Sequence, residues 1–280
     1  MNKMLYGLSV FSGIGGIELA LHEEVKTIAY VEKDPYAQAV LIKNMQEGEL
    51  DMGPIYDDVR TFPNKQYRGK VDIIFGGFPC QDISTAGKGA GIKEGTRSGL
   101  FLELIKVISQ IRPTFVFLEN VSAITRNGGD TVLGELTKAG YNCRWTTIQA
   151  SDVGAPHRRD RWFCLAHTSG DGWATDRMPP TESSQRQTQP QTKRNSKMAH
   201  TYCSRQQTWR KFQKEREEVL FDRGSSWCQD PAELKRTSKS FVGRVAYGIP
   251  QRVDRLKCLG NAVVPQQGRL AWKILTCDII

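Results

Sequence analysis

A cysteine follows an apolar run and a tight turn in the first third of the chain. The run Val71–Phe75 is rich in β-branched residues, and Gly76–Pro79 separates it from Cys80. A lone cysteine is commonly a small buried side chain, but a turn of this composition exposes the residue that follows it. An accessible thiolate in an electropositive setting is a nucleophile. We therefore predict that Cys80 is catalytic.

A carboxyl group ends a second apolar run. Glu119 directly follows Phe115–Leu118, where a partly apolar site would raise its pKa. A carboxyl that keeps its proton near neutral pH is suited to general acid catalysis. The alternative is a structural role for this segment, with Asn120 or Ser122 capping the helix that follows.

Two arginines, Arg159 and Arg161, stand two residues apart. On an extended strand they would share one face. Two guanidinium groups near Cys80 would favour its thiolate and could bind a pyrimidine carbonyl or a phosphate. The alternative is an edge strand protected by charge. His157, just before this pair, is either a general base or a surface residue.

A glycine-rich turn follows the first apolar run and precedes a helical stretch. Such a turn lets backbone N–H groups approach a ligand closely. Glu32 follows Gly13 by nineteen positions, a spacing at which a carboxylate binds ribose hydroxyls. Glu18 occupies the third glycine position of a dinucleotide fingerprint, so we expect another adenosine-containing cofactor rather than NAD. The residues of the turn are Phe11, Ser12, Gly13, Ile14, Gly15 and Gly16.

Short apolar runs alternate with amphipathic stretches up to about residue 166. This alternation predicts an α/β fold, with helices on both faces of a mostly parallel, doubly wound sheet and ligands at the carboxyl ends of the strands. The predicted strands are 8–11, 27–31, 71–75, 115–118, 143–148 and 162–166. The predicted helices are 16–22, 35–44, 99–111, 131–139 and 266–275.

Composition divides the 280 residues into three parts. The net charge is +9, and residues 178–214 alone carry eight Lys and Arg against one Glu, a net +7. This segment is either a solvated linker or a surface that contacts phosphates. We predict an ordered α/β domain over 1–167, a smaller polar insertion over 168–245, and a C-terminal segment over 246–280 that rejoins the first.

Several classes of protein are excluded. No apolar run approaches the ~20 residues of a membrane span, and the mean hydropathy is −0.45. Glycines and Glu18 interrupt the apolar N-terminal stretch, which argues against a signal peptide. The seven cysteines include no CxxC pair, so we expect neither a metal site nor disulfides, and a reducing compartment.

These motifs, in this order, resemble the cytosine-C5 DNA methyltransferases in their compact bacterial or phage form. The glycine-rich turn, Glu32 and Asp58-Val59 resemble the cofactor motifs of that family. Gly77–Gln81 resembles the nucleophile motif, and Glu119–Val121, Arg159–Arg161 and Gly260–Val263 resemble later motifs. The likeness covers about 1–166 and 241–280. The family usually has Gln where this chain has His157, and often an aromatic residue where it has Lys33.

The resemblance implies a Rossmann-like class I methyltransferase domain with a target-recognition insertion, S-adenosylmethionine as cofactor and duplex DNA as substrate. Cys80 would add to C6 of a flipped-out cytosine and Glu119 would supply a proton near N3. Arg161 would hold O2, and Arg159 would support the thiolate or its loop. The implied cofactor contacts are the glycine-rich turn with Glu32, Lys33, Asp58, Val59, Gly77, Pro79, Leu100, Asn261, Ala262 and Val263. The expected DNA contacts are Gln81, Ser84, Lys88, Arg97, Arg205 and Arg210, and the glycine-rich residues 82–98 are the expected lid.

Three other functions stay open at this point: an RNA cytosine-C5 methyltransferase, a catalytically inert DNA-binding module and a nicotinamide oxidoreductase. The retention of both Cys80 and Glu119 argues against an inert module, and Glu18 argues against nicotinamide. The resemblance implies a monomer in the cytoplasm of a bacterial or phage-infected cell, with any restriction endonuclease on a separate chain.

Overall fold

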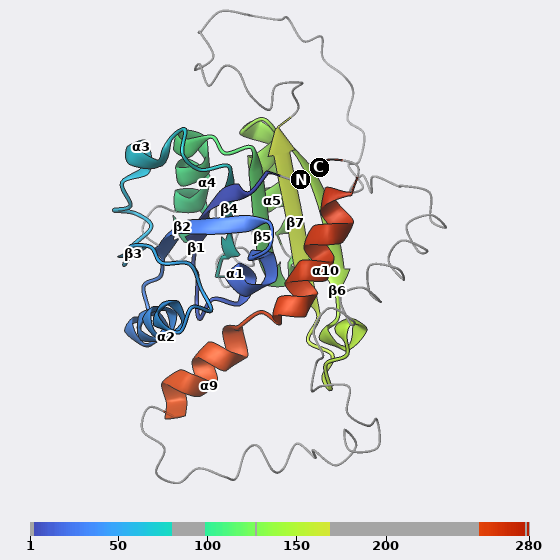
Figure 1. Cartoon of the computed structure of the whole chain (residues 1–280). Helices are drawn as coiled ribbons and strands as arrows, with labels where there is room; N and C mark the ends of the chain where they lie inside the picture. Colours follow the sequence, from blue (N-terminus) through green and yellow to red (C-terminus); the bar gives the residue numbers. More distant parts are fainter. Residues whose placement is uncertain (1–2, 80–98, 127, 169–251, 278, 280) are drawn as a thin grey trace, which may run out of the picture.

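The computed structural model describes residues 3–79, 99–126, 128–168, 252–277 and 279. Within this part, seven strands form one sheet in the order β3-β2-β1-β4-β5-β7-β6 (Figure 1). The strands are β1 (Leu5–Val10), β2 (Val25–Val31), β3 (Ile55–Tyr56), β4 (Ile73–Gly77), β5 (Phe115–Val121), β6 (Tyr141–Ile148) and β7 (Arg161–Thr168). The helices are α1 (Gly16–Leu21), α2 (Pro35–Gln46), α3 (Asn64–Tyr67), α4 (Gly99–Ile111), α5 (Gly129–Lys138), α9 (Arg252–Asn261) and α10 (Pro265–Thr276), with short 3-10 helices η3 (Ser122–Thr125) and η4 (Ala150–Val153).

The predicted α/β fold with a mostly parallel sheet is confirmed. Strands β3, β2, β1, β4 and β5 pair in parallel. Strand β7 is the exception, because it pairs antiparallel with both β5 and β6. The connection from β6 to β7 contains η4 but no crossover helix, and without a crossover two neighbouring strands must run in opposite directions.

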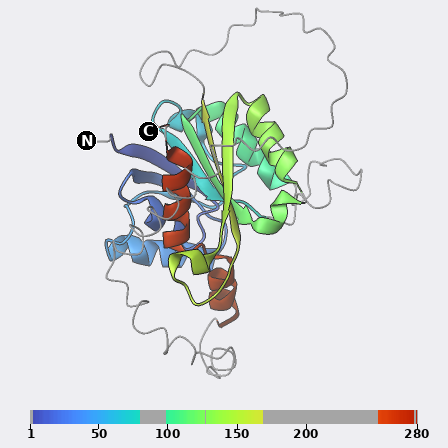
Figure 2. The same cartoon turned by 90° about the vertical axis from the view of Figure 1, so that its right-hand side faces the viewer.

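Both faces of the sheet are buried, because side chains in the central strands alternate between two apolar cores. In β4, Ile74 packs with α4 and α5, whereas Ile73 and Phe75 pack with α1 and α10. Figure 2 shows the red α10 on one side of the sheet and the green helices on the other. Because both faces are buried, the central strands appear in the sequence as continuous apolar runs.

The C-terminal helix α10 packs against the first part of the chain. Helix α10 packs against α1, and its Leu270 and Trp272 are buried with residues of β4 and β5. The predicted helix 266–275 is confirmed as part of α10 (Pro265–Thr276). Helix α9 was not predicted, and neither were β3 and α3, because each is short or lacks a clear apolar period. In the described ranges, no helix has the length and apolar character needed to cross a membrane.

Candidate functional site

A cavity of about 820 Å³ lies at the carboxyl ends of β1, β2, β4 and β5. It is the place where ligands bind in open sheets of this kind. Seventeen predicted site residues line it: Phe11, Ser12, Gly13, Ile14, Gly16, Glu32, Lys33, Asp58, Val59, Gly77, Pro79, Leu100, Glu119, Arg161, Asn261, Ala262 and Val263. Segments far apart in the sequence therefore meet at one site.

The glycine-rich turn closes one wall of the cavity. Gly13 and Gly15 have φ angles of +56° and +92°, a region that L side chains rarely adopt. A Cβ on Gly16 would lie 2.8 Å from the carbonyl oxygen of Val263, so the turn touches the connection between α9 and α10. Gly15 itself faces Leu50 and Leu41 and does not line the cavity. Gly15 therefore contributes to the bend of the turn, and its cofactor contact stays a prediction.

Glu32 links the turn to the end of β2. Its Oε2 accepts a hydrogen bond from the Gly13 N–H at 2.7 Å, and its Oε1 accepts one from the Asp34 N–H at 2.8 Å. Each carboxylate oxygen has more than one acceptor site, so both can still accept hydrogen bonds from a ligand. Glu32 is thus held in a fixed orientation on the cavity wall.

Asp58 and Lys33 form an exposed ion pair beside Glu32. The Lys33 Nζ lies 3.4 Å from Asp58 Oδ2, and the Arg60 N–H donates to Asp58 Oδ1 at 2.9 Å. The backbone hydrogen bond from Arg60, and then the Lys33 ammonium, lower the pKa of Asp58. Asp58 therefore stays ionised as an acceptor at the cavity rim.

Glu119 is buried against the guanidinium group of Arg161. Only 6% of Glu119 is exposed, and its Oε1 lies 2.7 Å from Arg161 Nε. Burial raises the pKa of Glu119 to about 7, although the charges of Arg161 and Arg159 oppose this. A Cβ on Gly77 would lie 2.7 Å from Glu119 Oε2, so only glycine leaves room for the carboxyl there. The arrangement supplies a carboxyl that gains or loses a proton near neutral pH.

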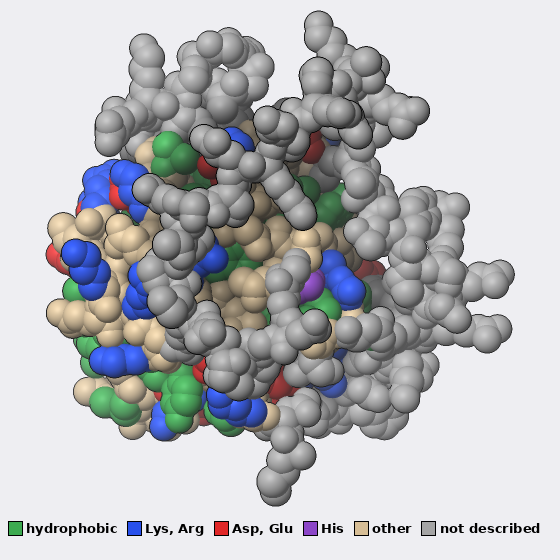
Figure 3. Space-filling model, turned by 90° about the horizontal axis from the view of Figure 1, so that it is seen from above, with side chains coloured by type: hydrophobic (Ala, Val, Ile, Leu, Met, Phe, Trp, Pro, Cys, Tyr) green, Lys and Arg blue, Asp and Glu red, His purple; other side chains and the backbone are tan. Residues whose placement is uncertain are grey.

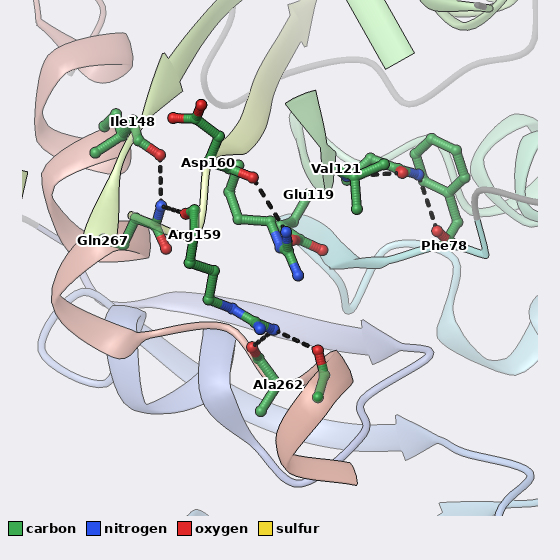
Figure 4. A network of polar contacts seen from close by, with 11 residues as sticks. Phe78, Glu119, Val121, Ile148, Arg159, Asp160, Ala262 and Gln267 are labelled. Atoms are coloured by element: carbon green, nitrogen blue, oxygen red, sulfur yellow. Dashed lines mark hydrogen bonds and ion pairs between the residues drawn. The ribbon is translucent and has the colours of Figure 1, made fainter. Parts of the chain in front are cut away.

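Arg159 points away from that pair. The prediction that Arg159 and Arg161 share one face of a strand is wrong, because β7 begins at Arg161 and Arg159 has a φ of +35°. Its Nη2 donates to the carbonyl oxygens of Gly260, at 2.9 Å, and Ala262. Figure 4 shows its side chain extending to the α9–α10 connection, while Gln267 donates to the Arg159 carbonyl. Arg159 does not line the cavity but supports one of its walls.

Asn120 holds the turn that leads to Cys80. Its Nδ2 donates to the Phe78 carbonyl oxygen at 2.9 Å, and its Oδ1 accepts from the Val121 N–H at 2.8 Å (Figure 4). The alternative in which Asn120 or Ser122 caps a helix is wrong, because η3 begins after Val121 with no side-chain cap. Asn120 is 3% exposed, so this bond is protected from water.

Ten further residues complete the cavity wall. Most of them lie within two positions of a predicted site residue, and the Asp34-Pro35 pair carries a helix-start signal. Lys257 pairs with Asp34 at 2.6 Å from 223 positions away, and no local pattern predicts such a contact. The ten are Ile17, Val31, Asp34, Ala37, Asp57, Phe78, Asn120, Val121, Lys257 and Cys258.

Several predicted residues lie outside the described part of the chain. They are Cys80, Gln81, Ser84, Lys88, Arg97, Arg205 and Arg210, with the expected lid 82–98 and recognition residues 169–245. On the face seen in Figure 3, the described Lys and Arg side chains lie in several separate places rather than in one patch. The described residues hold no group of three His, Cys, Asp or Glu side chains arranged for a metal ion.

The sheet order, the single reversed strand β7 and the cavity at the strand ends define a Rossmann-like methyltransferase fold. Two solved structures share it. A DNMT2 mutant of Spodoptera frugiperda has a TM-score of 0.50 and 22% identity, covering 62% of this chain and 53% of that one. The methyltransferase EhMeth of Entamoeba histolytica has a TM-score of 0.50 and 20% identity, covering 65% and 58%.

The family model for C-5 cytosine-specific DNA methylases matches residues 5–243, and the chain belongs to that family. The Type II methyltransferase M.CviJI of Paramecium bursaria Chlorella virus IL3A is 35% identical over 160 residues. The Type II methyltransferase M2.BsuMI of Bacillus subtilis is 37% identical over 168 residues. Each alignment covers 57% of this chain, but the chain spans only 42% and 41% of those relatives.

Proposed function

We propose that this protein transfers a methyl group from S-adenosylmethionine to C5 of cytosine in duplex DNA. The observation that carries the proposal is the buried Glu119–Arg161 pair. It lies on the same cavity as the end of the turn that precedes Cys80. A proton donor and a guanidinium group are what an activated pyrimidine needs at N3 and O2.

The residues that line the cavity fit S-adenosylmethionine. Glu32 and Asp58 offer carboxylate oxygens to hydroxyl and amino hydrogens, and Phe11, Val59 and Leu100 offer apolar surface. A cavity of about 820 Å³ is within the size range of sites for molecules of this kind. When bound, S-adenosylmethionine supplies an electrophilic methyl group.

The protein groups activate the base. The Cys80 thiolate forms a bond to C6, and the electron pair displaced from the ring moves toward N3, where Glu119 donates its proton. C5 then has the electron density to take up the methyl group. Loss of the C5 proton to solvent expels the Cys80 thiolate, and N3 returns its proton to Glu119. The aromatic ring, the nucleophile and the acid are all regenerated in this way. Arg161 holds O2 throughout.

Duplex DNA as the substrate follows from family membership and from the basic segment 178–214. The reacting carbon lies inside the base stack, so the nucleotide must leave the duplex to reach the cavity. Neutralising phosphates with Lys and Arg makes binding strongly dependent on salt. We assign base recognition to residues 168–245, with Arg205 and Arg210 among the phosphate contacts.

A mechanism-based probe tests this function. A duplex with 5-fluorocytosine at the target lacks the C5 proton, so the bond to Cys80 should persist after denaturation. We expect an adduct that forms with the wild type and is absent with Cys80→Ala, whereas Cys80→Ala binds S-adenosylmethionine normally. Methyl transfer by Cys80→Ala would contradict the mechanism. Methyl transfer to tRNA but not to duplex DNA would contradict the substrate.

A further inference from the structure

Glu18 is a buried carboxyl that the chemistry above does not use. It lies on α1, just after the glycine-rich turn, and is 4% exposed. Its Oε1 lies 2.5 Å from the Ser9 hydroxyl, which lies 2.7 Å from the Ser12 hydroxyl. Ser12 lines the cavity. Two serine hydroxyls therefore connect a buried acid to the cavity.

The number of protons in this chain fixes the direction of its hydrogen bonds. A hydroxyl has one hydrogen, so Ser9 donates either to Glu18 or to Ser12. With Glu18 protonated, Glu18 donates to Ser9, Ser9 donates to Ser12, and the Ser12 hydrogen is left for another acceptor. With Glu18 ionised, Ser9 donates to Glu18, and Ser12 must donate to Ser9.

Among the residues that the structure describes, the Ser12 hydrogen has only a weak acceptor. The Val31 carbonyl oxygen lies 3.5 Å from the Ser12 hydroxyl, which is long for a hydrogen bond from an O–H group. The same oxygen already accepts the N–H groups of Phe11, at 2.8 Å, and Ser12, at 3.2 Å. An acceptor atom in the cavity would therefore compete well for this hydrogen.

The surroundings of Glu18 favour its protonated form. Burial raises the pKa of Glu18 to about 7, and the charge of Glu32 adds to the rise, while the hydrogen bond with Ser9 opposes it. Tyr30, from β2, is a second acidic group that interacts with Glu18. On α10, which packs against α1, Arg269 pairs with Glu23, and Lys273 acts on Glu23 and Glu24.

We propose that Glu18 is a positioning residue for the cofactor, which in its protonated form directs the Ser12 hydroxyl to donate a hydrogen bond to an oxygen of the bound molecule. The proposal rests on the proposed function, because it requires S-adenosylmethionine or its product in this cavity. Both carry acceptor oxygens in their carboxylate and ribose hydroxyls. When Glu18 ionises, the Ser12 hydroxyl donates to Ser9 and no longer to the bound molecule. The affinity for S-adenosylmethionine or its product should therefore fall as the pH rises through about 7.

Calorimetric titration of the full chain with S-adenosylhomocysteine between pH 6 and pH 8 tests this. This molecule has no net charge, so the general effect of charge on Glu18 is small. We expect the wild-type Kd to rise about fivefold, the worth of one hydrogen bond. In Glu18→Gln, the amide donates to Ser9 at every pH, so this rise should disappear while the affinity at pH 6 is kept. Ser12→Ala should bind about fivefold more weakly at pH 6 and also lose the rise.

Glu119 titrates in the same range and lines the same cavity, so it serves as the matched control. In proteins that carry Glu119→Gln, replacing Glu18 by Gln should still remove the rise in Kd with pH that depends on Glu18. Identical pH profiles for the wild type and Glu18→Gln would overturn the proposal and leave the proposed function intact. A wild type that binds no S-adenosylhomocysteine at any pH would instead contradict the proposed function.

Discussion

At the scale of the residue, burial governs the chemistry of Glu119. Its raised pKa of about 7 keeps part of the population protonated at neutral pH, although the ion pair with Arg161 favours the charged form. We predict that Glu119→Gln lowers the rate of methyl transfer by at least about 100-fold, the usual worth of general acid catalysis. For the wild type at saturating S-adenosylmethionine, kcat should decline above about pH 7 as Glu119 loses its proton, and the variant should lack this decline.

Steady-state rates with tritiated S-adenosylmethionine from pH 5.5 to pH 9 measure both effects. Glu49→Gln removes the same charge from an exposed position and is the matched control, with an expected rate equal to the wild type. A Glu119→Gln variant with unchanged rate would remove Glu119 from the mechanism.

At the scale of the element, Arg159 connects the start of β7 to the joint between α9 and α10. Its guanidinium donates to the carbonyl oxygens of Gly260 and Ala262, and Ala262 lines the cavity. Hydrogen bonds from charged donors contribute more than neutral ones. We predict that Arg159→Ala loosens this joint and weakens cofactor binding about tenfold, an effect of about 1.4 kcal/mol.

Cofactor titration without DNA measures this effect. The neighbouring Arg158 is exposed, so Arg158→Ala removes the same charge and should leave the Kd unchanged. Equal affinities for the two variants would show that the joint does not depend on Arg159.

Elements explain which parts of the site could be predicted from the sequence. The glycine-rich turn and Glu32 follow a strand directly, and Glu119 lies near the end of β5. The carboxyl ends of parallel strands meet at one edge, so local patterns sufficed. The Lys257–Asp34 pair and the contacts of Arg159 depend on how distant segments pack. The Ser9–Glu18 bond depends on how β1 and α1 pack across the turn between them. The antiparallel direction of β7 could not be predicted either, because a strand that is buried on both faces has the same apolar pattern whichever way it runs.

At the scale of the whole molecule, two buried carboxyls make stability depend on pH. The pKa values of Glu18 and Glu119 rise from 4.5 to about 7 on folding. Between these values the native state holds more protons than the unfolded chain, so the free energy of unfolding falls as the pH rises. We predict a loss on the order of 3 kcal/mol per carboxyl between pH 4.5 and pH 7, with a plateau above that range.

Denaturant unfolding at half-unit pH steps measures the loss. Glu18→Gln and Glu119→Gln should each reduce the slope, and the double variant should reduce it further, because the amides do not titrate. A wild type whose stability rises steadily across this range, with the same slope in both variants, would contradict the prediction.

The packing of α10 on α1 and the sheet also has a consequence for synthesis. The ribosome synthesises β1 through β7 long before α10. Leu21 and Phe117 therefore stay uncovered in the nascent chain until Leu270 and Trp272 are made and pack on them. Exposed apolar surface of this kind is recognised by chaperones and prone to aggregation. The cavity is also incomplete at those early stages, because the wall formed by residues 261–263 is translated after β1 through β7.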